Sequence, residues 1–310
     1  MRSSLIKFLM YRLLEGFITL AILGLIVFFV SRHTGNPVDL FLGPDVTAED
    51  VARVTRVLGL DQPLYTQLRI FLAGLIRGDF GISFRTRRPV WELVMERLPT
   101  SLVLVIESVI FALVIGVYLG VMAAKCKGTW VDTISRLIAV FGMAAPPFWI
   151  GMILMQVFSA KLGILPAIGM KGPLSHLLPV LTLGFFVMAG FMRLVRSSML
   201  EVLDSEFAKM ARIKGVSERK VTWVHCLRNS LLSVITFAGL YIALLLTGAV
   251  VVEVVFAWPG VGLLAYQAVQ SRDYNLMQGI MIILGAIVVG ISLFIDIIYA
   301  VLDPRVRRGF

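Results

Sequence analysis

The stretch TSLVLVIESVIFALVIGVYLGVMAA, residues 100–124, decides the fold class of this chain. Glu107 is its one charged residue, and a helix needs about 20 mostly apolar residues to cross a bilayer. The whole chain of 310 residues is 58% hydrophobic and 15% charged, whereas soluble globular proteins carry about 25% charged residues. Its mean hydropathy is +0.91. The composition therefore predicts an integral membrane protein.

Five further runs share this character, so we expect an all-α polytopic membrane protein with six transmembrane helices. The expected spans are residues 10–31, 100–124, 137–162, 177–200, 231–252 and 277–301. Pro146 and Pro147 are expected to bend the third span. The first span follows basic residues as a signal peptide does, but no small-residue cleavage site follows it, so an uncleaved signal anchor is expected.

Basic residues in the short connections predict the orientation. Lys and Arg gather at the N-terminus, between spans two and three, between spans four and five, and in the tail. The opposite short connections hold only Lys161, Lys171 and Arg272. By the positive-inside rule, both termini are expected in the cytoplasm. Residues 32–98 then form an extracytoplasmic segment, in which TAEDVARVTRVLGL is expected to be an amphipathic helix capped by Thr47.

The connection between spans four and five is unusually basic. ARIKGVSERKVTWVHCLRN, residues 211–229, holds five Lys or Arg residues and one His. The pattern predicts an amphipathic helix ended by Gly215 and a second helix capped by Ser217. The apolar faces are expected to carry Leu203, Phe207, Met210 and Ala211 on the first helix, and Val221, Val224, Leu227 and Leu231 on the second. Such a connection either presses on a protein partner or lies on anionic headgroups.

Motifs for chemistry are missing from the sequence. It contains no phosphate-binding loop, no H-E-x-x-H and no G-x-S-x-G, and its three histidines are scattered. Cys126 and Cys226 are too few for a disulfide framework and are expected to be structural. We therefore expect no enzymatic activity, no cofactor and no metal site in this chain. The net charge of +10 is assigned to membrane orientation rather than to nucleic-acid binding.

Ionisable residues and glycines within the spans carry further expectations. Glu107 is the deepest carboxylate, and it either lines a polar pathway or makes a helix–helix hydrogen bond. Glu15 and Asp296 are expected to meet Arg12 or backbone groups, and Arg193 and Arg196 to reach the cytoplasmic surface. Close helix packing is expected at three glycine pairs: Gly116 and Gly120, Gly184 and Gly190, and Gly285 and Gly290.

The basic connection resembles the EAA loop of ABC-transporter permeases. Lys209, Met210 and Ala211 occupy its E-A-A positions, Gly215 its glycine, and His225, Leu227 and Arg228 its closing positions. Only Ala211, Gly215 and Leu227 match the general pattern, but ARIKG and HCLRN resemble the form found in the dipeptide, oligopeptide and nickel importer family. GLDQPLYTQ, RGDFGISF, GAVVVEVVFAWPGVGLL, RDYNLMQG and DIIYAVLDPRVR resemble further segments of its first-permease branch. Ser233 departs from the family, which often has proline there.

This resemblance implies a type I importer permease fold and the architecture of a larger assembly. Residues 1–98 would hold the signal anchor and the extracytoplasmic segment, residues 99–303 the permease domain with its coupling loop at about 201–229, and residues 304–310 a cytoplasmic tail. The implied partners are a homologous second permease, two ATPase subunits that hold ATP and Mg²⁺, an extracytoplasmic solute-binding protein and membrane lipid. The location would be the bacterial inner membrane.

The resemblance also implies a function. The chain would form half of a pathway for di- or oligopeptides or a related small solute, with a nickel chelate or glutathione as alternative cargo. Trp258, Pro259, Gly260 and Tyr266 would face the binding protein or the pathway, although Trp258 and Tyr266 also suit headgroup depth. An ion-coupled secondary transporter is the rival reading, although the sequence shows no convincing inverted repeat.

Overall fold

A computed structural model of the chain describes residues 2–33 and 59–302 and five isolated positions between them, 47, 49, 52, 55 and 56. The expected helix beginning at Thr47 and the tail 304–310 lie outside the continuously described part. The described residues are helical apart from turns, loops and an isolated bridge between Ile82 and Pro89. The chain divides into two compact units, one formed by Met1–Pro99 with Leu263–Phe310 and the other by Thr100–Gly262.

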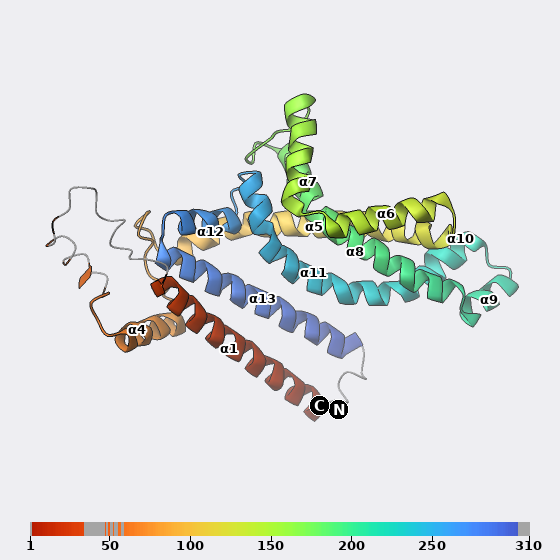
Figure 1. Cartoon of the computed structure of the whole chain (residues 1–310). Helices are drawn as coiled ribbons and strands as arrows, with labels where there is room; N and C mark the ends of the chain where they lie inside the picture. The colour runs from red at the N-terminus through yellow and green to blue at the C-terminus, as the bar shows by residue number, and fades with distance from the viewer. Residues whose placement is uncertain are drawn as a thin grey trace. The chain divides into compact units, whose positions relative to one another are not determined.

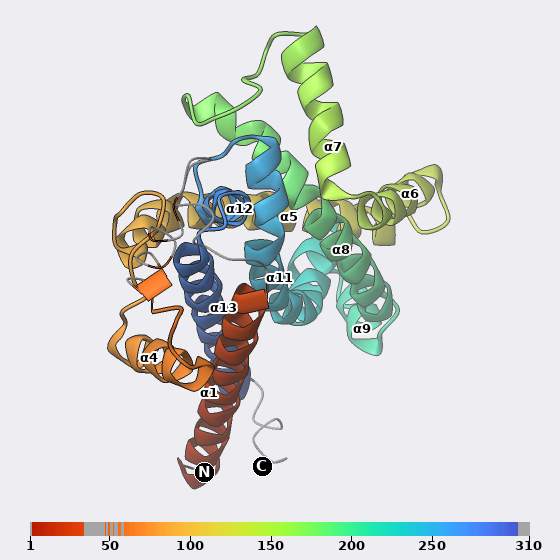
Figure 2. The same ribbon diagram turned by 60° about the vertical axis from the view of Figure 1, so that its left-hand side comes forward.

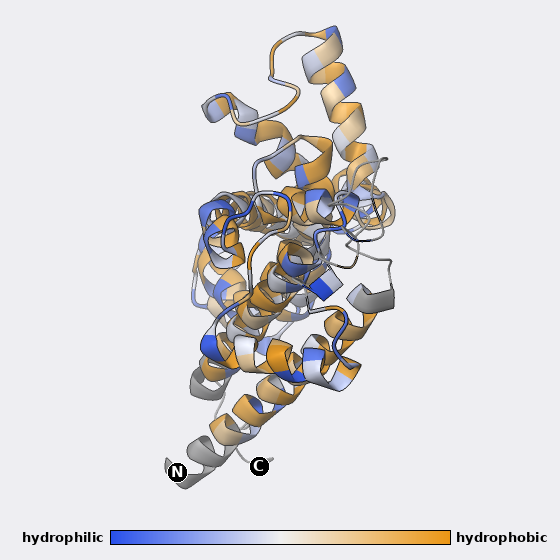
Figure 3. Ribbon diagram, turned by 90° about the vertical axis from the view of Figure 1, so that its left-hand side faces the viewer, coloured by the Kyte–Doolittle hydropathy of each residue, from blue (hydrophilic) through white to orange (hydrophobic). Residues whose placement is uncertain are grey.

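The apolar helices match the spans expected from the sequence. Five described helices are long and apolar enough to cross a bilayer, and counting one bent pair as a span gives six. Apolar residues, drawn in orange, predominate along these helices (Figure 3). The five are α1 (Arg2–His33), α5 (Val90–Lys125), α8 (Leu177–Leu203), α11 (Leu227–Val255) and α13 (Tyr274–Leu302). The all-α prediction is confirmed, although α5 begins ten residues before the expected span.

The third expected span is bent at Pro146 and Pro147 as predicted, and the bend is a break between two helices. Helix α6 (Trp130–Ala144) is followed by α7 (Pro147–Leu154), which continues as the π-helix η1 (Met155–Lys161). The two parts meet at 108°, and α7 turns sharply away from α6 (Figure 2). Ala145 and Pro146 are both extended, because a residue that precedes proline is pushed out of the helical region. Pro147 then begins α7 at a position where its missing N–H costs nothing.

In the unit Thr100–Gly262, α5 and α8 pack closely through glycines. A Cβ atom at Gly116 would lie 2.8 Å from the Met188 carbonyl oxygen, and one at Gly120 would lie 2.8 Å from the Met192 carbonyl oxygen. No larger residue fits at this distance, so the expected role of the G-x-x-x-G pair in helix packing is confirmed within the chain. Gly290 differs, because a Cβ atom there would meet nothing within 4 Å.

In the other unit, α1 and α13 run side by side (Figure 1). Arg12 forms ion pairs with Glu15 at 2.9 Å and with Asp296 at 3.2 Å, which confirms the expected contacts. Nearer the other end of the two helices, the Gln278 amide donates a hydrogen bond to the Ser31 hydroxyl. The helices are therefore joined by polar contacts at both ends.

The same unit ties together two segments that are distant in sequence. Asp273 is buried and its Oδ2 accepts hydrogen bonds from the Ser83 hydroxyl at 2.6 Å and from the Arg85 N–H at 3.1 Å. Its Oδ1 accepts from the Leu276 N–H at 3.2 Å, which caps α13. Asn275 donates to the Ile82 carbonyl at 3.1 Å. The segments RGDFGISF and RDYNLMQG thus fold against each other.

Candidate functional site

The connection between α8 and α11 begins with a short, well-ended helix, α9 (Glu206–Ile213). The Ser205 hydroxyl accepts a hydrogen bond from the Ala208 N–H at 3.3 Å and so caps its first turn. At the other end Gly215 takes a φ of 76°. The Gly215 N–H donates to the Arg212 carbonyl, and the Val216 N–H donates to the Ala211 carbonyl. This is a Schellman ending, so the expected glycine stop is confirmed.

An ion pair closes the turn that follows α9. The Arg212 guanidinium donates two hydrogen bonds of 3.0 Å to the carboxylate of Glu218 and a third of 3.2 Å to the Leu203 carbonyl. Hydrogen bonding to Arg212 lowers the pKa of Glu218, and the same contact raises the pKa of Arg212. A bidentate pair fixes direction as well as distance, so α9 is held in one orientation on its connection.

Helix α9 exposes a row of apolar side chains. Phe207 is 49% exposed, Met210 52% and Ile213 79%, while Ala208 on the opposite side is fully buried. Their spacing of three residues places Phe207, Met210 and Ile213 on one side of the helix. We call these three residues the α9 stripe.

The site residues expected from the sequence fall at different positions around this stripe. Lys209 is exposed and pairs with Glu206 at 2.7 Å, and Ala211 is half-buried. The His225 ring meets the Phe207 ring edge-on at 6.2 Å between centroids. Leu227 is half-buried and Arg228 is exposed, both at the start of α11. Ile213, the most exposed member of the stripe, was absent from the expected set.

The second half of the connection differs from the expectation. After the single turn α10 (Glu218–Lys220), residues form the π-helix η3 (Val221–Cys226). A π-helix has a wider turn, so Val221 and Cys226 are buried together while Val224 is exposed. The prediction that Val224 lies on one apolar face with Val221 and Leu227 is therefore wrong. The Ser217 side chain makes no capping hydrogen bond, which also corrects the predicted cap.

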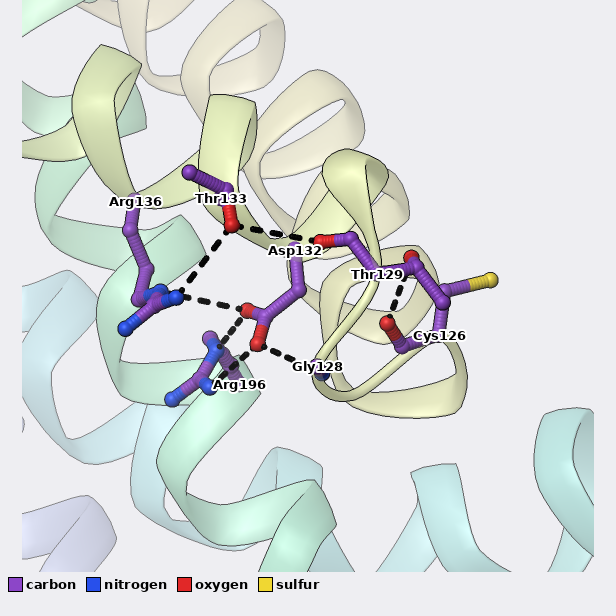
Figure 4. Close-up of polar contacts among 7 residues, drawn as sticks. All are labelled: Cys126, Gly128, Thr129, Asp132, Thr133, Arg136 and Arg196. Carbon is purple, nitrogen blue, oxygen red and sulfur yellow. Dashed lines mark hydrogen bonds and ion pairs between the residues drawn. The ribbon is translucent and has the colours of Figure 1, made fainter.

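Asp132 of α6, which is buried, and Arg196 of α8, whose side chain is 23% exposed, form an ion pair (Figure 4). Arg196 donates from Nε to Oδ1 at 2.6 Å and from Nη2 to Oδ2 at 2.9 Å. The Gly128 N–H donates to Oδ2 at 3.1 Å, and Arg136 lies 3.6 Å from Oδ1. The sequence predicted that Arg196 reaches the cytoplasmic surface; its side chain is partly exposed, and its charge is in addition paired with Asp132.

The corner after α11 contains the residues expected to face a partner. Trp258 is fully buried, its indole N–H donates to the Thr100 carbonyl at 3.2 Å, and Pro259 is half-buried. Gly260 is buried, and a side chain there would collide with the carboxylate of Glu253. Tyr266, on α12 (Val261–Gln270), is exposed. Of the four expected residues, Tyr266 therefore has the accessible side chain.

Glu253 is a buried carboxylate that the sequence reading did not single out. Its Oε1 accepts a hydrogen bond of 2.6 Å from the Ser101 hydroxyl, and that hydroxyl accepts one of 2.8 Å from the Val261 N–H. These two hydrogen bonds therefore join the end of α11 to α5 and α5 to the start of α12. The signal in the sequence was a glutamate near the end of an apolar run.

Glu107 lines a cavity of about 600 Å³ together with His176. The Glu107 carboxylate lies 2.8 Å from Nδ1 of His176, at the end of the short helix η2 (Pro173–His176). The His176 ring packs edge-on against Trp258 at 4.7 Å. Both expectations for Glu107 are thus compatible with its position, since it makes a polar contact and faces open space.

Family models match nearly the whole chain. Residues 116–308 match the binding-protein-dependent transport system inner membrane component, and residues 5–105 match the N-terminal region of such membrane components. The chain belongs to this family. It is the permease subunit of an ABC importer, a multi-pass inner membrane protein, and ATP hydrolysis belongs to other subunits of such importers.

Some proteins similar to this permease match it along its length, and a solved structure matches its fold. The glutathione transport system permease protein GsiC of Escherichia coli (strain K12) is 40% identical over 304 residues, which is 98% of this chain and 99% of the relative. The GsiC protein of Salmonella choleraesuis (strain SC-B67) matches to the same extent. In fold, the permease resembles the MetNI methionine ABC transporter in an inward-facing conformation, with a TM-score of 0.58 and 18% identity over 69% of this chain and 97% of that chain.

Proposed function

We propose that the α9 stripe is the surface through which this permease docks on an ATPase subunit. The observation that carries the proposal is a short helix between two spans that exposes Phe207, Met210 and Ile213 to solvent. Exposed apolar side chains grouped on one rigid element are typical of a protein interface. The Ser205 cap and the Arg212–Glu218 ion pair hold that element in place before a partner arrives, which lowers the entropy lost on docking.

The charges around α9 favour a protein partner over lipid headgroups. Attraction of a basic loop to anionic lipid requires cations that are free to meet the phosphates. Here Lys209 is paired with Glu206 and Arg212 is paired with Glu218. Two of the cations nearest the stripe are therefore neutralised within the connection, while the apolar side chains stay uncovered.

The larger assembly follows from this docking. The permease forms half of the translocation pathway with a homologous second permease, and two ATPase subunits hold ATP and Mg²⁺. Both termini and the connection that carries α9 are cytoplasmic in this proposal. The roles expected above are kept for the three segments, residues 1–98, 99–303 and 304–310. A solute-binding protein delivers cargo on the side where Tyr266 is exposed. The proposed cargo is glutathione or a short peptide, since permeases 40% identical to this one are named for glutathione transport. Family membership leaves no support for the ion-coupled alternative.

The docking proposal is tested by placing one charge on the stripe. Ile213→Glu in the purified permease assembly should abolish co-purification of the ATPase subunit, because it puts a carboxylate into an apolar interface. Val224→Glu is the matched control, since Val224 is an exposed apolar residue of the same connection outside α9. Retention of the ATPase by both variants would contradict the proposal, and equal loss from both would point to a general charge effect.

The cargo is tested separately. Proteoliposomes with the complete assembly and its binding protein should take up labelled glutathione or a labelled dipeptide. Uptake should require ATP on the side of the membrane where the ATPase subunits lie. Uptake of neither, together with uptake of a nickel chelate, would reject the proposed cargo and leave the docking surface untouched.

A further inference from the structure

Helix α4 (Leu64–Arg77) lies beside the C-terminal part of α1 (Figures 1 and 2). The Phe71 ring contacts the Phe28 ring at 5.4 Å between centroids. Four residues further along α4, Leu75 lies 3.6 Å from the position that a Cβ atom would take at Gly24. The two helices therefore meet over the last two turns of the α1 span.

These contacts set the level of α4 along the α1 span. The apolar span of α1 ends at Ser31, so Phe28 and Gly24 lie three and seven residues inside its end. At 1.5 Å per residue this corresponds to about 5–10 Å along the helix axis. Amphipathic helices that bind membranes bury their apolar face to the same depth, about 5–10 Å.

A second side of α4, about a quarter turn from the side that meets α1, exposes apolar side chains. Tyr65 is 76% exposed, Leu72 37% and Ile76 88%. Their spacing of seven and four residues places them on one side of the helix, and we call them the α4 stripe. Arg69 lies on the same side of the helix as the stripe, and Arg77 follows Ile76; both are exposed, and their long side chains can reach the headgroups from within the interface.

We propose that α4 is an interfacial helix whose α4 stripe is buried in lipid, in the leaflet at the C-terminal end of α1. Three observations carry this: the depth set by Phe28 and Gly24, the exposed stripe, and the apolar surface that α1 itself exposes at the same level, at Ile26 and Phe29. The proposed occupant is acyl chain, because the α1 span exposes apolar side chains at the level of the α4 stripe, and apolar side chains at that depth bind lipid. In the orientation proposed above, this is the outer leaflet.

The proposal makes a prediction about two isoleucines on one helix. Ile76 belongs to the α4 stripe, whereas Ile70 is also exposed but on another side of α4, where it lines a cavity of about 240 Å³ with Gln67, Asp79 and Asn275. Lipid should cover Ile76, and water should reach Ile70.

The experiment uses nitroxide labels on single cysteines in the complete transporter, reconstituted in bilayers, with Cys126 and Cys226 replaced by alanine. Collisions with oxygen, which enters lipid, are compared with collisions with a water-soluble nickel chelate. Ile76→Cys should favour oxygen like Phe17→Cys, which is exposed in the middle of the α1 span. Its nickel collision rate should be several-fold below those of Ile70→Cys and of Thr86→Cys, an exposed position in a turn.

Three outcomes decide the matter, provided each labelled variant retains ATP-driven uptake. Oxygen access without nickel access at Ile76 supports the interfacial helix. Equal nickel access at residues 76 and 70 overturns it, because α4 would then lie in water. Exclusion of both reagents from residue 76 also overturns it, because a protein partner would then cover the stripe.

Discussion

Removal of the Asp132 carboxylate should destabilise the permease more than any single change on its surface. Asp132 is 2% exposed and receives two hydrogen bonds from Arg196, one from Gly128 and a longer ion pair from Arg136. In Asp132→Ala the Arg196 charge stays between α6 and α8 without its anion (Figure 4). Loss of one partner from a fully buried ion pair costs about 3–5 kcal/mol, and we expect the lower end, about 3 kcal/mol, because the Arg196 side chain is 23% exposed.

Two companion variants separate the charge from the packing. Asp132→Asn keeps an oxygen that can accept from Arg196, so its cost should be about 1.5–3 kcal/mol, the value of one hydrogen bond to a charged group. The double variant Asp132→Leu with Arg196→Met removes both charges. It should recover most of the stability lost in Asp132→Ala, because apolar replacement of a buried pair is often neutral.

The assay is reversible unfolding of the purified permease in mixed micelles with increasing denaturing detergent. The expected order of unfolding free energy is parent, double variant, Asp132→Asn and Asp132→Ala. The reasoning is refuted if Asp132→Ala lies within about 1 kcal/mol of the parent, which is the range of exposed pairs. It is also refuted if the double variant is the least stable of the four.

Three further predictions concern the two connections. Gly215→Ala should lower the free energy of unfolding by about 1–2 kcal/mol because the backbone at residue 215 is left-handed, and no clash adds to this, since no atom lies within 4 Å of a Cβ there. Gly215→Asn should lower it less. The amount of co-purified ATPase should therefore decrease from glycine to asparagine to alanine. Glu253→Ala should lower the free energy of unfolding by roughly 1–3 kcal/mol, because the Ser101 hydroxyl loses its acceptor, whereas Glu253→Gln should lower it less. Equal thermal unfolding of both variants and the parent would contradict a stabilising role for these hydrogen bonds. Arg212 lowers the pKa of Glu218, so the ion pair is fully formed above the ordinary pKa of 4.5 and is lost as pH falls through the lowered pKa. An NMR titration of the Glu218 carboxyl should show this lowered pKa. In Arg212→Ala the pKa of Glu218 should return to the ordinary range.

Composition predicted the spans because a helix that crosses a bilayer must be mostly apolar over about 20 residues. Residues 100–124 lie within α5, and the third span is interrupted at Pro146 and Pro147 as their chemistry requires. The glycine stop of α9 was also predictable, since Gly215 needs a positive φ that few other residues accept. Each of these features depends on neighbouring residues alone.

Features that depend on distant residues could not be predicted. Asp132 and Arg196 are 64 positions apart, and nothing near Arg196 indicates that its charge meets an anion rather than water. The exposed Val224 could not be foreseen either, because a π-helix shifts which residues face inward and periodicity assumes an ordinary turn. Glu253 was overlooked because a glutamate near the end of an apolar run also suits the membrane surface.

The hydrogen bond between Ser31 and Gln278 joins residues that are 247 positions apart, and this has a consequence for biogenesis. A ribosome adds roughly 5–20 residues per second, so α1 enters the membrane about 10–50 s before α13 is made. During that time three contacts cannot form: Ser31 with Gln278, Arg12 with Asp296, and Ser83 with Asp273. A chain that stops before α13 therefore lacks the contacts that join its first and last spans, which would mark it as incomplete to the proteases that survey the membrane.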